Sequence, residues 1–180
     1  DCDTLLLSCG LLPENELSLR AGVPLSPVTG GAIVDDAFET EVPGIFACGN
    51  VLHVHDLVDH VSDEAEIAGR SAARCATAQP EAPSAKAKGR ETAIVDGRGV
   101  RGCVPQKVRA DGVEETVVLS FRPAGVFKKA MWRVRAGERV LFSRKALILT
   151  PGESQSAEIP RAAFAGAGEA IVEIVTEEST

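Results

Sequence analysis

The sequence predicts two kinds of structure in one chain, an α/β segment over residues 1–76 and an all-β domain over residues 90–180. Short apolar runs and one long helical pattern fill the first segment. The second alternates apolar and polar residues in short stretches separated by Gly and Pro, which is typical of strands. Residues 77–89 between them are rich in Ala, Pro, Lys and Ser without an apolar period, which indicates a linker.

The composition is that of an ordinary globular protein. Of the 180 residues, 44% are hydrophobic and 25% are charged, which argues against disorder. The net charge of -7 argues against a nucleic-acid partner, because phosphate binding needs a local excess of Lys and Arg. No apolar run reaches the roughly 18 residues of a membrane span, and no signal peptide opens the chain. We therefore expect a soluble, cytoplasmic protein with no membrane partner.

The cysteines favour reduced thiols over a disulfide framework. There are five of them, an odd number, and no two form a C-x-x-C pair. We expect most of them to be small buried side chains rather than catalytic thiols. They are Cys2, Cys9, Cys48, Cys75 and Cys103.

Three short strands and one long helix are predicted in the first segment. Residues 4–9 form an uninterrupted apolar run, which suits a parallel strand buried on both faces. Shorter apolar runs follow at residues 32–35 and 45–48, and Pro13 favours a short helical turn before them. A helix is expected from about Leu57.

The corner at Gly49-Asn50 joins the last of these strands to the helix. In α/β proteins a ligand binds beyond the carboxyl end of a strand at such a corner, and Gly49 allows the backbone to approach it closely. We expect Asp56 to cap the helix. Apolar residues at helical spacing predict its buried face: Leu57, Val61, Ala65, Ala68 and Ala72.

Three sequence patterns within residues 1–76 resemble one family, the FAD-dependent pyridine-nucleotide (NAD(P)/FAD) oxidoreductases with two dinucleotide-binding domains. T-x-x-P-G-I-F-A-x-G-N-V, over residues 40–51, looks like their second FAD-binding motif, which usually ends Ala-x-Gly-Asp. G-A-I-V-D-x-x-x-x-T, over residues 31–40, resembles the strand before that motif. D-T-L-L-L-S-C-G-L-L-P-E-N, over residues 3–15, resembles the segment that crosses from the NAD-binding to the FAD-binding domain. The patterns occur in the family's order.

This resemblance implies the C-terminal part of an FAD-binding domain over residues 1–76. The flavin would transfer hydride between NAD(P)H and an acceptor that the sequence does not identify. Asn50 would bond a ribityl hydroxyl, and the backbone N–H groups of Leu57 and Val58 would face the pyrimidine edge of the flavin. No catalytic residue is implied. The residues expected to bind FAD are Gly49, Asn50, Val51, His55, Asp56, Leu57 and Val58.

The family's two G-x-G-x-x-G phosphate loops do not occur in the sequence. We therefore expect the chain to be incomplete alone, and its partner to be the missing N-terminal FAD- and NAD-binding portion or a subunit that supplies it. We also expect self-association of the isolated chain, because an apolar strand without neighbours pairs with other strands.

All three histidines lie in H-V-H-D-L-V-D-H, residues 53–60. This run resembles the H-x-H-x-D-H metal motif of the metallo-β-lactamase fold, although Leu57 stands where that motif has Asp. A metal site at His53, His55 and Asp59 therefore remains an alternative. It competes with the simpler interpretation that His53 and His60 are polar loop residues near the surface.

Residues 90–180 predict an antiparallel β-sandwich of the immunoglobulin type, because short strands recur between Gly and Pro turns. Pro105 confines the segment at residues 100–108 to a sheet edge. The many Lys and Arg residues of this domain form a solvated face or, alternatively, a docking surface. A second functional hypothesis is thus a non-catalytic interaction module. The predicted strands are residues 116–122, 131–135, 140–142, 146–150, 156–159 and 170–175.

Overall fold

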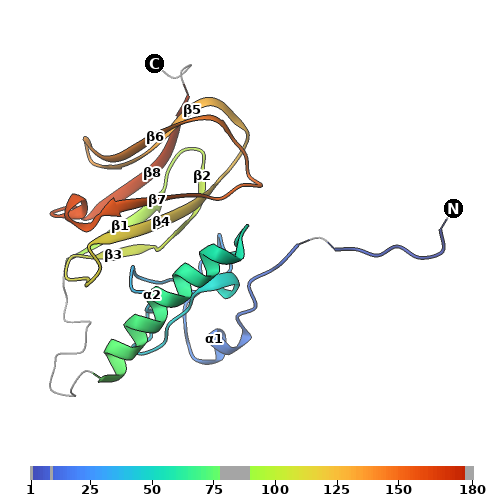
Figure 1. Cartoon of the computed structure of the whole chain (residues 1–180), viewed down its shortest axis with the longest axis horizontal. Helices are drawn as coiled ribbons and strands as arrows, with labels where there is room; N and C mark the ends of the chain where they lie inside the picture. Colours follow the sequence, from blue (N-terminus) through green and yellow to red (C-terminus); the bar gives the residue numbers. More distant parts are fainter. Residues whose placement is uncertain (1, 9, 78–89, 177–180) are drawn as a thin grey trace.

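The computed structural model describes residues 2–8, 10–77 and 90–176 (Figure 1). We call residues 2–77 the first part and residues 90–176 the strand-rich part. The first part contains α1 (Glu16–Arg20), η1 (Gly49–Val51) and α2 (Val58–Thr77). The strand-rich part contains β1 (Glu91–Asp96), β2 (Val100–Val104), β3 (Lys107–Arg109), β4 (Thr116–Pro123), β5 (Phe127–Ala136), β6 (Arg139–Leu149), β7 (Gln155–Pro160), η2 (Arg161–Phe164) and β8 (Glu169–Thr176). The chain is thus mixed α/β, with mostly strands and one long helix.

Two sheets form the strand-rich part. One has the strand order β3-β1-β8-β5-β6 and the other the order β2-β4-β7. Every pair is antiparallel except β1 and β8, which run parallel. The strands predicted at residues 116–175 are present, and the two predicted within residues 140–150 form one continuous strand, β6. The immunoglobulin-like sandwich stays a prediction.

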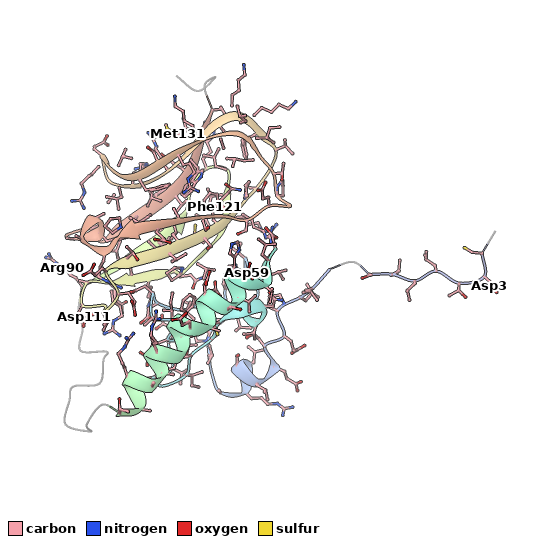
Figure 2. The ribbon with its side chains drawn as sticks, in the orientation of Figure 1. Asp3, Asp59, Arg90, Asp111, Phe121 and Met131 are labelled. Atoms are coloured by element: carbon pink, nitrogen blue, oxygen red, sulfur yellow. The ribbon has the colours of Figure 1, made fainter. Side chains whose placement is uncertain are left out.

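One hydrophobic core lies between the two sheets. Side chains alternate across each strand, so that Val117, Leu119 and Phe121 of β4 point inward together. Trp132 of β5 is fully buried, and its ring lies edge-on to Phe121 with the ring centroids 4.9 Å apart. Figure 2 shows Phe121 within the strand-rich part.

The segment around Pro105 connects the two sheets and also the two parts of the chain. Pro105 lies between β2 and β3, which are edge strands as predicted. Gln106 donates its backbone N–H to the carbonyl of Val34 at 3.1 Å, and its side-chain oxygen accepts the N–H of Val34 at 2.9 Å. Val104 belongs to the core of the first part. The division at residues 77–89 stays a prediction, since residues 78–89 lie outside the described chain.

The strand predicted at residues 4–9 is wrong for the described chain. Leu5, Leu6 and Leu7 are 78%, 90% and 72% exposed and belong to no strand. Figures 1 and 2 show this segment, with Asp3, extending away from the other elements. A strand buried on both faces needs neighbours on each side, and the described chain supplies none here. Cys9 lies outside the described residues.

The other short strands of the first part are reduced to isolated bridges. Val34 pairs with Thr40, and Glu39 pairs with Phe46, but no continuous ladder forms. Hydrogen bonds within turns hold this segment instead, as where Ala47 donates its N–H to the carbonyl of Phe38 at 3.0 Å. The segment still packs a small core together with α2.

The helix α2 begins at Val58, close to the predicted start, but its buried face is rotated from the prediction. Glu64, Ala68 and Ser71 are buried, whereas Leu57 and Ala65 are exposed. On this face the carboxylate of Glu64 has partners in the preceding loop, Gly49, His53 and His55. Among the described helices, none is both long and apolar enough to cross a membrane.

The cysteines differ in exposure more than expected. None of the four that lie within the described residues forms a disulfide. Cys103 is buried and Cys48 is half-buried, whereas Cys2 and Cys75 are exposed. Burial raises the pKa of the Cys103 and Cys48 thiols. The expectation of mostly buried thiols is thus wrong for two of them.

Replacing Asp35 by asparagine is expected to stabilise the protein at neutral pH. Burial raises the pKa of Asp35 to about 6, although the N–H groups of Ala37 and Glu39 donate hydrogen bonds to it. Since this pKa lies above the ordinary 3.8, the ionised carboxylate costs stability above pH 6, and the cost disappears below pH 3.8. Asp35→Asn should therefore gain about 1 to 3 kcal/mol at pH 7 and nothing at pH 3.5, measured by urea unfolding.

The neighbouring Asp36 provides the control. It accepts the backbone N–H of Arg109 at 2.7 Å and lies 2.5 Å from the Arg161 guanidinium. Asp36→Asn should therefore destabilise the protein by about 1 to 3 kcal/mol at pH 7. A loss of stability in Asp35→Asn at pH 7 would show that its carboxylate is net favourable.

Candidate functional site

The loop before α2 takes its shape from Gly49. This residue has φ +71°, in the left-handed region where glycine is favoured. A Cβ at Gly49 would lie 3.1 Å from Cγ1 of Val61 on α2, so the close approach of loop and helix also favours glycine. The 3-10 turn η1 begins at this residue, and the chain then passes through His53 and His55 to the helix.

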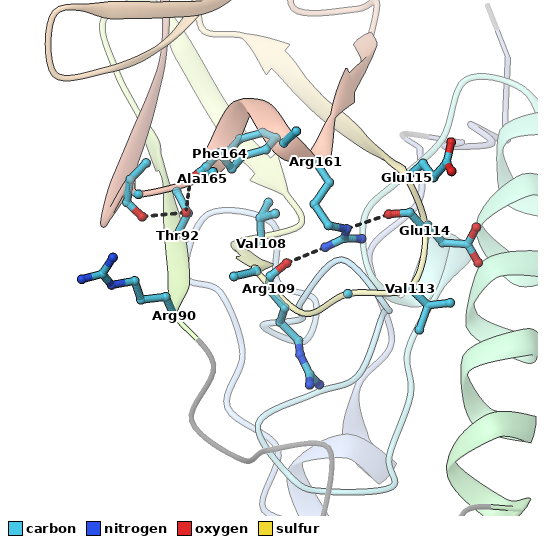
Figure 3. A pocket seen from close by; sticks show the side chains of 15 residues that line it. Arg90, Thr92, Val108, Arg109, Val113, Glu114, Glu115, Arg161, Phe164 and Ala165 are labelled. Atoms are coloured by element: carbon cyan, nitrogen blue, oxygen red, sulfur yellow. Dashed lines mark hydrogen bonds between the residues drawn. The ribbon is translucent and has the colours of Figure 1, made fainter.

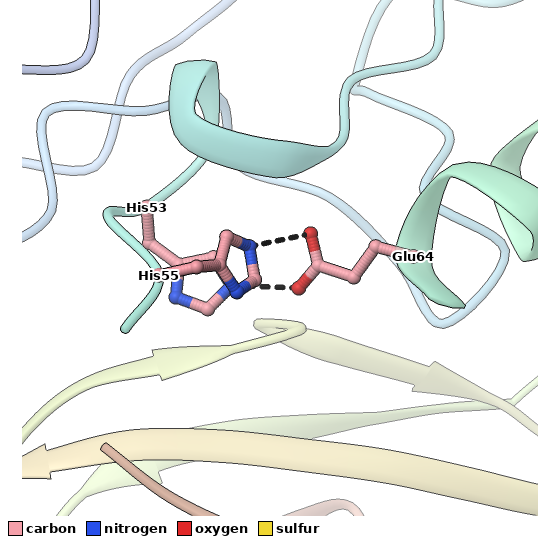
Figure 4. Close-up of side chains that lie close together, drawn as sticks. All are labelled: His53, His55 and Glu64. Carbon is pink, nitrogen blue, oxygen red and sulfur yellow. Dashed lines mark hydrogen bonds and ion pairs between the residues drawn. The ribbon is translucent and has the colours of Figure 1, made fainter. Parts of the chain in front are cut away.

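The carboxylate of Glu64 on α2 contacts three residues of this loop, and Figure 4 shows two of them, His53 and His55. Its Oε2 accepts the backbone N–H of Gly49 at 2.9 Å and lies 3.1 Å from Nε2 of His55. Its Oε1 lies 2.7 Å from Nε2 of His53. The side chains of His53, His55 and Glu64 are 11%, 6% and 11% exposed. We call these three residues the histidine–glutamate cluster.

The carboxylate of the cluster is ionised. Burial acts to raise the pKa of Glu64, but hydrogen bonds from His53, His55 and Gly49 outweigh it and lower this pKa to about 2. An ionised carboxylate can only accept hydrogen bonds, so both histidines must carry their proton on Nε2 when they donate to it. A buried charge is thereby compensated by three donors.

Asn50 uses its side-chain oxygen within the loop. Its Oδ1 accepts the backbone N–H of His55 at 3.0 Å, which holds His55 beside Glu64. Asn50 was predicted to bond a ribityl hydroxyl. In the structure its oxygen accepts one hydrogen bond within the loop, and its amide nitrogen is a further group that can donate to a ligand.

Asp56 faces the strand-rich part instead of capping α2. Its carboxylate forms a short ion pair with Arg122 of β4 and accepts the backbone N–H of Ser154 at 2.7 Å. Burial opposes the change, but the hydrogen bonds from Ser154 and Arg122 lower the pKa of Asp56. Arg122 also donates to the carbonyl of Val54 at 3.0 Å. Asp56 thus fixes the loop against β4, a contact that the sequence analysis did not predict.

The remaining predicted residues divide between loop and surface. Val51 ends η1 and is half-buried, whereas Leu57 and Val58 are 58% and 74% exposed. The metal alternative joined His53 and His55 to Asp59, but Asp59 is exposed at the beginning of α2 (Figure 2) and Glu64 takes its place.

The sequence analysis missed Glu64, although a signal was present. Glu64 lies four residues before Ala68, so both occupy the face of α2 that was expected to be apolar. A charged residue on a predicted buried face needs a partner, and the two nearby histidines were the available candidates.

A cavity of about 440 Å³ lies beside the cluster, between α2 and the strand-rich part. His55 and Glu64 line it from one side, and Ser120, Arg144 and Ser156 from the other. It is polar on both sides, unlike the core of either part.

A larger cavity of about 710 Å³ lies at the far end of the sheets (Figure 3). Two of its polar side chains donate to backbone carbonyls of its own lining. Arg161 donates to the carbonyl oxygens of Arg109 and Glu114 at 2.5 and 2.6 Å, and Thr92 donates to the carbonyl of Ala167 at 2.8 Å. These bonds stabilise the sheet ends, so we place the candidate site at the histidine–glutamate cluster and its loop.

Residues 1–82 match the family model of the pyridine nucleotide-disulphide oxidoreductases. The matched range contains the three sequence patterns described above, and it confirms their resemblance to this family. Dihydrolipoyl dehydrogenase of Manduca sexta is 39% identical over 66 residues, which are 36% of this chain and 13% of that protein. The chain thus matches only a small portion of that relative's length. No solved structure matches the chain.

Proposed function

We propose that the chain supplies part of an FAD-dependent, NAD(P)-linked oxidoreductase, in which residues 1–76 complete the FAD-binding domain. The observation that carries this proposal is the arrangement at the family's second flavin motif. The Gly49-Asn50 corner leads within a few residues to the beginning of α2, where Leu57 and Val58 are exposed. A helix of 20 residues has free N–H groups in its first turn, which suit the electron-rich edge of a flavin.

The residues present fit the ribityl end of FAD. The left-handed backbone at Gly49 lets the corner turn without a Cβ, and the exposed Asn50 keeps an amide N–H₂ that can donate to a hydroxyl. Val51 would position the backbone beside it. His55 and Asp56 would act indirectly, because their side chains contact Glu64 and Arg122. When bound, the flavin would supply the hydride chemistry.

The exposed leucines of residues 5–7 favour the proposal that this segment binds a partner. Burial of apolar surface is worth about 25 cal/mol per Å², so three consecutive exposed leucines are costly in water. We propose that this segment becomes a strand when it pairs with the upstream FAD- and NAD-binding portion. In its absence the same segment would promote association between copies of the chain.

The proposal is tested by producing the chain together with that upstream portion in the presence of FAD. A yellow protein that NADH or NADPH bleaches would support the oxidoreductase, and the more effective nucleotide would identify the co-substrate. A folded but colourless complex would favour the second hypothesis, a non-catalytic interaction module built on the strand-rich part.

In the same reconstituted protein, Asn50→Leu is expected to weaken FAD retention by about 2- to 10-fold, because one hydrogen bond to the ribityl chain is lost. Asn50→Asp is the matched control. It restores the family's usual residue and leaves one oxygen for the N–H of His55 and one for the hydroxyl. The measurement is the FAD absorbance per protein after gel filtration. Unchanged flavin content in Asn50→Leu would remove Asn50 from the site.

A further inference from the structure

We propose that His53, His55 and Glu64 form a binding site for a divalent transition-metal cation such as zinc. The site uses the side chains of His53, His55 and Glu64, whereas the flavin contacts proposed above come from Asn50 and from backbone N–H groups. Two imidazoles and one carboxylate are ligands that zinc and ferrous iron both accept, and catalytic zinc sites commonly have three protein ligands. The test below uses zinc.

The geometry brings three ligand atoms to one point. One ring nitrogen of each histidine and a carboxylate oxygen of Glu64 all lie within 4.8 Å of one another. In a tetrahedral zinc site with bonds of about 2.0 to 2.2 Å, ligand atoms lie roughly 3.3 Å apart. The observed separations from Glu64 to His53 and His55 are 2.7 and 3.1 Å. Small rotations of the rings would therefore admit a cation between them.

The three ligands are held in place by the backbone around them. The N–H of Gly49 fixes Oε2 of Glu64, and Oδ1 of Asn50 fixes the backbone of His55. Metal sites depend on such outer hydrogen bonds to orient their ligands. The alternate spacing of His53 and His55 lets both rings point to one side of the loop, with ring centroids 4.1 Å apart.

The charge of the cluster also suits a cation. Glu64 is a buried anion, and a bound divalent cation would replace the two imidazole hydrogen bonds with direct bonds to Nε2 of both rings, whose protons would then lie on Nδ1. Since three protein ligands leave at least one coordination position, water or another oxygen ligand would complete the site. The cavity of about 440 Å³ beside His55 and Glu64 provides the space for that ligand.

The experiment is a zinc titration of the full chain in competition with a chromophoric chelator, with metal content measured after dialysis. We expect one zinc per chain. His53→Gln and His55→Gln should each weaken binding by about 100-fold or more, beyond the 10- to 100-fold typical of outer-shell changes. Glutamine keeps an N–H that can donate to Glu64 but is a poor zinc ligand, so these variants preserve the hydrogen bonds and should stay folded by circular dichroism.

Asp59→Asn is the matched control, because Asp59 is exposed and lies outside both the cluster and the cavity beside it. It should bind zinc like the wild type. Acidification should weaken binding as protons compete for the imidazoles. The proposal is overturned if the wild type takes up no zinc, or if Asp59→Asn loses as much affinity as His55→Gln. The latter result would indicate unspecific binding by exposed side chains.

Discussion

Replacing Trp132 by alanine is expected to lower the free energy of unfolding by about 3 to 5 kcal/mol. The indole is fully buried between Phe121 and Phe142, with ring centroids at 4.9 and 4.8 Å. Its removal would leave a cavity between the two sheets, because strands paired on both sides cannot collapse to fill it. Urea unfolding followed by circular dichroism measures the loss.

Trp132→Phe separates the effect of ring packing on stability from the effect of the buried indole N–H. Phenylalanine keeps an aromatic ring against Phe121 and removes the indole N–H, which has no hydrogen-bond partner within the described chain. An unsatisfied buried donor costs about 1 to 3 kcal/mol, so its removal offsets part of the lost packing. We expect a loss well below that of Trp132→Ala. Equal losses in the two variants would contradict this account of the core.

Glu64→Gln is expected to cost about 3 kcal/mol at pH 7. The pKa of Glu64 is lowered from 4.5 to about 2, and one pKa unit corresponds to about 1.4 kcal/mol. Glutamine cannot replace the carboxylate, because its amide nitrogen would meet an N–H of His53, His55 or Gly49 instead of accepting from it. The variant should retain the fold with a less stable first part.

The stability cost of Glu64→Gln is expected to depend on pH. A lowered pKa means that the carboxylate stabilises the folded protein fully above pH 4.5, and that the contribution is lost as the pH falls towards 2. The difference between wild type and Glu64→Gln should therefore shrink between pH 4.5 and pH 3 in urea unfolding. Glu66→Gln, an exposed position on the same helix, should change stability by less than about 0.5 kcal/mol at either pH. A pH-independent cost at Glu64 would assign the effect to shape rather than charge.

Local patterns predicted the parts of the fold that depend on near neighbours in sequence. The beginning of α2, the strands of residues 116–175 and the edge position of Pro105 all follow from periodicity or from the chemistry of one residue. The Gly49-Asn50 corner was found in the same way. Its identification needed only the flanking motif, because glycine permits the left-handed backbone that the corner adopts.

Contacts between distant residues account for what the sequence did not predict. Asp56 binds Arg122 and Ser154, which lie 66 and 98 residues further along the chain. These long-range partners take the place of the N-cap of α2 that local rules predicted for Asp56. Glu64 reaches back 15 residues to Gly49 for the same reason. The predicted strand at residues 4–9 depends on strands that the described chain does not supply.

The chain contains one tryptophan and no tyrosine. Its intrinsic fluorescence therefore comes from Trp132 alone and senses only the interior of the strand-rich part, whereas helical ellipticity comes mainly from α2. Two optical signals thus follow the two parts separately in a single sample. Coincident melting curves would mean that the bonds of Arg122 and Gln106 join them into one cooperative unit, and a separation of the curves would mean that each part melts alone.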